Sequence, residues 1–144
     1  MKKVMVFGTF DLIHFGHLKM LQQAKKLGNY LIVVIARDKN VEKIKKSRCF
    51  HTENERKEIM ENIKLVDKVV FGSKKYVYKV ILEQKPNIIA LGYDQKMFVN
   101  NLEGYLEKES INSKIVRLKS FKEKRLKTHL IKKYGNKTSN CNNK

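Results

Sequence analysis

Two histidines near the N-terminus have the types and spacing for phosphate chemistry. His14 and His17 are three residues apart, with Gly16 between them. Imidazole N–H groups can donate hydrogen bonds to phosphate oxygens on which negative charge grows. The glycine removes a side chain, so a nucleotide can come close to the backbone. The cluster therefore predicts a site for a phosphate-bearing ligand.

The flanking residues predict where these histidines lie. Residues 4–7 form a short apolar run, typical of a strand buried on both faces, and Gly8 ends it. Residues 18–27 have helical spacing and stop at Gly28, with Leu18, Leu21, Ala24 and Leu27 on one face. The histidines are thus expected where a strand gives way to a helix, whose free N–H groups and partial positive charge bind phosphate.

The run Gly8-Thr9-Phe10-Asp11, followed by His14-Phe15-Gly16-His17, resembles the first signature of the cytidylyltransferase-like nucleotidyltransferases. The resemblance covers roughly residues 3–134. It implies an enzyme that transfers a nucleotidyl group from a nucleoside triphosphate to a phosphate monoester and releases pyrophosphate. It also implies that the nucleotide is bound by Gly8, Thr9, Phe10, Asp11, His14, Gly16 and His17, and that both histidines are catalytic.

Four further apolar runs predict strands, at residues 30–36, 67–71, 88–91 and 114–118. Helices are expected from residue 52 and over residues 76–84, 98–108 and 127–134. The alternation predicts a doubly wound α/β fold, a five-stranded parallel Rossmann-like sheet ordered 3-2-1-4-5. Residues 1–134 are expected to form one nucleotidyltransferase domain, and residues 135–144 a disordered polar tail.

Polar residues follow the second strand at the same predicted sheet edge. Asp38 suits a cap for the next turn, or, by the resemblance, a contact on the acceptor side of the pocket. The lysines at 43, 45 and 46 suit a solvated face. The resemblance instead implies that this basic segment holds the acceptor's phosphate, with Lys43 and Lys46 among the catalytic residues and Lys45 binding the acceptor.

Thr52 and Glu55 have capping-box spacing and predict a helix start. Arg56 lies in the first turn of that helix, where it suits an exposed partner of a residue one turn away. The resemblance implies a catalytic arginine that holds the β and γ phosphates, to which its rigid fork of donors is suited. The inner side of the helix is expected to carry Ile59, Ile63 and Leu65.

Two later segments complete the predicted nucleotide site. Gly92-Tyr93-Asp94-Gln95 follows the fourth strand and suits a plain turn. The resemblance implies that Gly92 and Asp94 line the base pocket, and the run is closest to the Gly-x-Asp-Gln of archaeal FAD synthases. The family's second, Ser/Thr-rich signature corresponds to residues 124–130, which lack its glycine. Only Thr128 keeps the hydroxyl that is implied to bind triphosphate.

Three functions remain open from these residues. Ala36-Arg37-Asp38 and Gly92-Tyr93-Asp94-Gln95 favour adenylylation of FMN by ATP. The alternative is a cytidylyltransferase that uses CTP and glycerol 3-phosphate or a related alcohol phosphate. The third is a basic RNA-binding or regulatory domain without catalysis. For both enzymes, Mg²⁺ is expected to arrive on the triphosphate, without a protein ligand.

Composition sets limits on partners and location. The formal charge of +18 would suit nucleic acid, an anionic membrane or polyphosphates. The lysines are spread along the chain without a recognition-helix or zinc-finger motif, so we do not expect a nucleic-acid partner.

No apolar run approaches the ~20 residues that span a bilayer. Cys49 and Cys141 have no metal-ligand spacing, and a cytoplasmic protein is expected. The resemblance also implies a homodimer.

Overall fold

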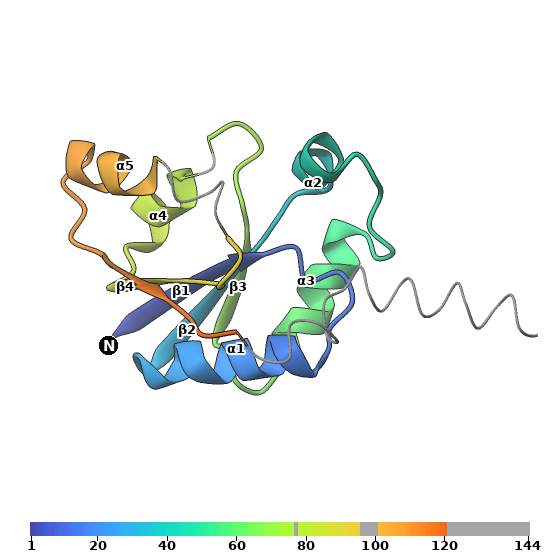
Figure 1. Ribbon diagram of the computed structural model, residues 1–144, viewed down its shortest axis with the longest axis horizontal. Coiled ribbons are helices and arrows are strands. Elements are labelled where there is room, and N and C mark those ends of the chain that lie inside the picture. Colours follow the sequence, from blue (N-terminus) through green and yellow to red (C-terminus); the bar gives the residue numbers. More distant parts are fainter. Residues whose placement is uncertain (77, 96–100, 121–144) are drawn as a thin grey trace, which may run out of the picture.

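The computed structural model describes residues 1–76, 78–95 and 101–120, which contain one five-stranded parallel sheet (Figure 1). The sheet order is β3-β2-β1-β4-β5, which confirms the predicted topology. The strands are β1 (Lys3–Gly8), β2 (Tyr30–Ile35), β3 (Lys68–Phe71), β4 (Ile88–Leu91) and β5 (Lys114–Arg117). Because β1 lies in the centre and the chain winds away from it in both directions, its carboxyl end lies at the switch point of the sheet.

Helices cover both faces of the sheet (Figure 1). On one face lie α1 (Phe15–Lys26) and α3 (Glu53–Glu61), and on the other lie α4 (Lys79–Gln84) and α5 (Leu102–Lys108). A further helix, α2 (Asp38–Lys45), directly follows β2. This three-layer arrangement requires strands that are apolar on both faces.

The side chains of β1 alternate between two apolar cores. Val4 and Val6 pack in the cluster that contains Leu21 of α1 and Met60 of α3. Met5 and Phe7 pack in the opposite cluster, with Ile81 of α4 and Leu102 of α5. The unbroken apolar run near the N-terminus is therefore explained by burial on both sides of a central strand.

Several predicted boundaries are corrected by the structure. Helix α1 begins at Phe15 rather than at residue 18, because His14 caps it. Helix α2 was not predicted at all. Ile59 is exposed, and its neighbour Met60 reaches the core instead, because the inner face of α3 passes through residues 56 and 60. The predicted helix over 127–134 and the predicted tail lie outside the described residues.

None of the helices in the described part of the chain has the length and apolar composition that a membrane-spanning segment requires.

Candidate active site

The loop of residues 9–14, here called the motif loop, joins the carboxyl end of β1 to the start of α1. Figure 1 shows this loop near the start of α3. The turn formed by residues 92–95 follows β4, the neighbour of β1 in the sheet. Both loops leave the sheet at the carboxyl ends of their strands, beside the switch point at β1. Open α/β sheets bind ligands at this position.

His14 and His17 cap the start of α1 with their own rings. The N–H of Gly16 donates to Nδ1 of His14 at 3.1 Å, and the N–H of His14 donates to Nδ1 of His17 at 3.2 Å. The ring centroids are 3.8 Å apart. Since each Nδ1 accepts a hydrogen bond, each neutral ring carries its proton on Nε2. The capping box thus leaves two Nε2–H donors side by side at a helix N-terminus.

Both rings are held in the neutral form. Burial lowers the pKa of His14, and it lowers the pKa of His17 to about 4, with the positive charges of His14 and Lys45 adding to the effect. At neutral pH the two imidazoles therefore act as hydrogen-bond donors without carrying a full charge. The effect of Lys45 also shows that this lysine of α2 lies within electrostatic reach of His17.

The ring of Phe10 fixes the position of His17. Phe10 is 4% exposed, and it meets His17 edge-on with the ring centroids 5.4 Å apart. The backbone of Phe10 has φ of 52°, an uncommon conformation for a residue with a large side chain. A Cβ on Gly8 would lie 2.6 Å from the Phe10 ring, so only glycine fits there. Gly8 and the Phe10 side chain thus support the histidine from within the core.

Asp11 joins the motif loop to the segment before α3. Asp11 is 5% exposed, and its carboxylate accepts the N–H of Phe50 and the N–H of His51 at 2.9 Å each. Both oxygens are therefore committed to the backbone of a segment about forty residues away. Asp11 therefore fixes the motif loop relative to the segment that precedes α3.

Arg56 is fully buried and contacts protein groups on two sides. Its Nη1 donates to the carbonyl of Thr9 at 2.8 Å, and its Nη2 donates to Oδ1 of Asp38 at 2.7 Å. Asp38 also accepts the N–H of Glu53 at 3.1 Å. The interpretation of Arg56 as an exposed helical partner is therefore wrong, because the residue points inward and ties the motif loop to the start of α2.

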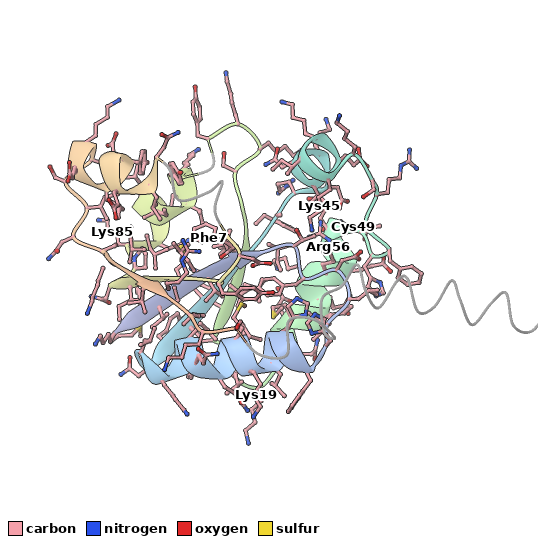
Figure 2. All side chains as sticks on the ribbon, in the orientation of Figure 1. Phe7, Lys19, Lys45, Cys49, Arg56 and Lys85 are labelled. Atoms are coloured by element: carbon pink, nitrogen blue, oxygen red, sulfur yellow. The ribbon has the colours of Figure 1, made fainter. Side chains whose placement is uncertain are left out.

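The lysines of α2 lie on different sides of that helix. Val41 is its buried residue, and Lys45 follows one turn later on the same side. Lys43 is about 200° around the helix from Val41, and Lys46 is the C-cap. Figure 2 shows Lys45 near Cys49 and Arg56, and the charges of both Lys45 and Arg56 act on Cys49. Of the three predicted lysines, Lys45 is the one brought toward the histidines.

Gly92 and Asp94 lie in the turn after β4, with Gly92 buried and Asp94 exposed. Two residues that the sequence did not assign hold this turn. The side chain of Gln95 bridges Gly92 and Phe7, and Arg117 donates to the carbonyls of Gly92 and Gln95. Arg117 ends the fifth strand, so the rule that selected Asp38 and Asp94, a polar residue at the carboxyl end of a strand, could have selected it.

The structure therefore brings the predicted residues of the motif loop, the start of α2, the start of α3 and the 92–95 turn to one edge of the sheet. This edge carries the Nε2–H donors of the two neutral histidines, the ammonium group of Lys45 nearby, and backbone groups of the loops. Thr128, the predicted triphosphate residue, lies outside the described part of the chain. Within the described residues, no three His, Cys, Asp or Glu side chains are grouped as a metal site.

Comparison with known sequences identifies close relatives. The family model described as cytidylyltransferase-like matches residues 5–134. A protein of Archaeoglobus profundus named FAD synthase is 44% identical over 123 residues, which is 85% of this chain and 78% of that protein. An FAD synthase of Korarchaeum cryptofilum is 47% identical over 123 residues, covering 83% of each chain.

Comparison with solved structures gives the same fold. A Thermoplasma volcanium protein, described as a lipopolysaccharide core biosynthesis protein, has a TM-score of 0.78 at 38% identity and covers 83% of this chain and 98% of that one. The pantoate-beta-alanine ligase of Francisella tularensis has a TM-score of 0.61 at 18% identity, covering 91% of this chain and 67% of that one. The second likeness concerns the fold alone.

Proposed function

The chain belongs to the cytidylyltransferase-like family, and we propose that it is an FAD synthase that joins AMP from ATP to the phosphate of FMN. Relatives with this name are 44% and 47% identical over most of the chain. The observation that carries the proposal is the pair of Nε2–H donors that the capping box of His14 and His17 leaves at the start of α1.

In the proposed reaction, an oxygen of the FMN phosphate attacks the α-phosphorus of ATP. A new P–O bond forms, the bond between the α-phosphorus and the bridging oxygen breaks, and pyrophosphate leaves with the electron pair. No protein nucleophile is needed, since positioning and charge stabilisation supply the rate enhancement. Mg²⁺ is proposed to enter with the triphosphate, and we assign it no protein ligand.

His14 and His17 are proposed to donate from Nε2 to the α-phosphate and to the oxygen that leaves. Because their Nδ1 atoms are fixed by backbone N–H groups, the rings cannot rotate away without breaking the helix cap. Preorganised donors of this kind stabilise charge that develops in the transition state without any cost of reorganisation. Neutral imidazoles suit the role, because each Nδ1 must stay unprotonated to accept the backbone N–H that orients its ring.

Lys45 is proposed to hold the FMN phosphate. Its charge reaches His17, so a phosphate between the two residues would lie near the histidines that act on ATP. Lys43 and Lys46 are proposed to add to the local positive potential. Asp38 and Arg56 are proposed to position this acceptor side through their ion pair.

Three further expectations stay proposals. Thr128 is proposed to bind the triphosphate, the chain is proposed to act in the cytoplasm, and a homodimer is proposed as its assembly. Thr128→Val should raise the KM for ATP. Cell fractionation should find the protein in the cytoplasm, and sedimentation should give the mass of a dimer.

The deciding experiment is a matrix of ATP and CTP against FMN and glycerol 3-phosphate, with pyrophosphate release as the readout. The proposal expects release with ATP and FMN together, and formation of FAD. Release only with CTP and glycerol 3-phosphate would make the chain a cytidylyltransferase. No release with any pair, together with RNA binding that persists at physiological salt, would favour the non-catalytic alternative.

A further inference from the structure

The side chain of Gln95 connects the carboxyl ends of two neighbouring strands. Its Nε2 donates to the carbonyl of Phe7 at 2.9 Å, and its Oε1 accepts the N–H of Gly92 at 2.8 Å. The Cα pairing of β1 with β4 ends at Val6 and Ala90. Beyond that pair, the amide of Gln95 spans the point where β1 leads into the motif loop and β4 leads into the 92–95 turn.

Arg117 holds the same turn from the other side. It is the last residue of β5 and pairs in register with Leu91 of β4. Its Nη1 donates to the carbonyl of Gly92 at 2.7 Å and to the carbonyl of Gln95 at 2.8 Å. Hydrogen bonds from a charged donor are stronger than those between neutral groups. One guanidinium thus fixes the first and last carbonyls of a four-residue turn.

The turn also closes on itself, since the N–H of Gln95 donates to the carbonyl of Gly92 at 3.2 Å. The carbonyl of Gly92 therefore accepts from Gln95 and from Arg117. The turn is tied to β1 through the carbonyl of Phe7 and to β5 through Arg117, whereas Asp94 within it is exposed. Such a turn presents one backbone arrangement to a ligand, which is the requirement for recognising a flat, hydrogen-bonding ring.

We propose that Gln95 and Arg117 are positioning residues that hold the 92–95 turn in the form that binds the base of ATP, an inference that rests on the proposed function. Neither residue needs to touch the nucleotide. Arg117 acts through the carbonyls of Gly92 and Gln95, and Gln95 acts through Phe7 and Gly92. Together they keep a fixed separation between the 92–95 turn and the motif loop. Base recognition and histidine placement are thereby linked at the centre of the sheet.

The test compares Arg117→Met with Lys114→Met. Lys114 begins the same strand, is exposed, and lies at the end of β5 remote from the turn. Calorimetric binding of ATP to each variant is measured without acceptor, and KM and kcat are measured with FMN. We expect Arg117→Met to weaken ATP binding about tenfold, the scale of one charge-assisted hydrogen bond, and to raise the KM for ATP while kcat and the KM for FMN change little. Lys114→Met should match the wild type.

Two further variants separate positioning from a merely structural role. Arg117→Lys keeps a cation that can donate to both carbonyls, so it should recover part of the affinity for ATP. Gln95→Glu loses the donor to Phe7 and should weaken ATP binding in the same direction. These variants also carry the test if Arg117→Met does not fold. A variant that melts earlier but binds ATP as the wild type does would overturn the proposal.

The outcomes also separate this inference from the proposed function. If the wild type binds ATP but forms no FAD, while Arg117→Met binds ATP weakly, the acceptor is wrong and the positioning role stands. If the wild type forms FAD and both Arg117→Met and Gln95→Glu bind ATP normally, the inference is wrong and the function stands. If the wild type binds no ATP, both are wrong.

Discussion

Arg56 donates from Nη2 to Oδ1 of Asp38 at 2.7 Å, and this ion pair joins the first turn of α3 to the first residue of α2. The guanidinium has no exposed surface, whereas the side chain of Asp38 keeps 34% of its exposure. A buried cation costs free energy unless its donors are satisfied. Nη1 and Nη2 of Arg56 are bonded, whereas its buried Nε has no hydrogen-bond partner among the described residues. The pair therefore sets the distance between the helix that carries Lys45 and the motif loop, whose Thr9 carbonyl binds the other guanidinium nitrogen.

Arg56→Met should destabilise the fold, because it removes the cation that bonds to Oδ1 of Asp38 and to the carbonyl of Thr9. We expect the free energy of unfolding to fall by about 3 kcal/mol, which is the scale for breaking a buried ion pair. Unfolding in urea measures this change. Arg48→Met is the matched control, since the Arg48 side chain is 92% exposed and its change should stay within about 0.5 kcal/mol. A stable Arg56→Met protein with reduced kcat would instead indicate direct contact with phosphate.

His14→Asn should separate the two uses of the first histidine. Asparagine is a good N-cap and can keep the hydrogen bond to the N–H of Gly16, but it lacks the Nε2–H donor. We expect both His14→Asn and His14→Ala to lower kcat by about 10²–10³, the effect of losing one preorganised donor. Only His14→Ala should also lose about 1 kcal/mol of stability. Full activity in His14→Asn would show that the ring serves the helix cap alone.

The fold could be predicted because its strands carry continuous apolar runs and its main helices show a periodic apolar face. The strand order followed from the alternation of these elements. Helix α2 was not predicted, because it buries only Val41 among its eight residues and its remaining positions are mostly charged. The helix is only eight residues long, and its two apolar positions, Val41 and Ile44, form too short a pattern to distinguish it from a charged loop. Its place after β2 depends on the contacts of Asp38 with α3.

The site was predicted where neighbours in the chain act together, as His14 and His17 do. Contacts between distant segments could not be predicted. Asp11 accepts backbone N–H groups from residues 50 and 51, and Arg117 donates to the carbonyls of Gly92 and Gln95. A backbone group is present at every position, so the sequence does not reveal which one a polar side chain will bind. The supporting contacts therefore needed the three-dimensional structure.

Lys45→Ala should weaken binding of the acceptor more than binding of ATP. Lys45 is exposed, but it lies on the same side of α2 as the buried Val41, and its charge reaches His17. We expect the KM for FMN to rise about tenfold, the scale of one hydrogen bond to a charged group. Lys39→Ala changes an exposed lysine of the same helix and should leave that KM unchanged. Equal effects of the two substitutions would mean that only the general positive potential matters.

Two glycines of the site should respond differently to alanine. A Cβ at Gly8 would lie 2.6 Å from the Phe10 ring, so Gly8→Ala should cost about 1–3 kcal/mol of stability through overpacking. A Cβ at Gly92 would meet Asp94 and Gln95 at 3.5 Å, an ordinary contact. Gly92→Ala should therefore keep its melting temperature but raise the KM for ATP, if the base approaches that backbone. A normal KM in Gly92→Ala would remove Gly92 from the nucleotide site.

His17 should titrate near pH 4 in the free protein. Burial, and then the charges of His14 and Lys45, lower its pKa from 6.5 to about 4. In the unfolded chain the imidazole takes up a proton near pH 6.5, while the native ring stays neutral, so the unfolded state binds more protons between these values. Native stability should consequently fall as the pH is lowered from about 6.5 to 4, and should not change through this group above pH 6.5.

NMR titration of the imidazole nitrogens measures this behaviour directly, with His17→Asn used to assign the signal. The neutral ring should show its proton on Nε2, because Nδ1 accepts the N–H of His14. Adding ATP should raise the pKa of His17, since the negative triphosphate favours the charged ring. A free-protein pKa of 6 or above, or a neutral ring protonated on Nδ1, would contradict the capping geometry, and with it the arrangement of donors on which the proposed catalysis depends.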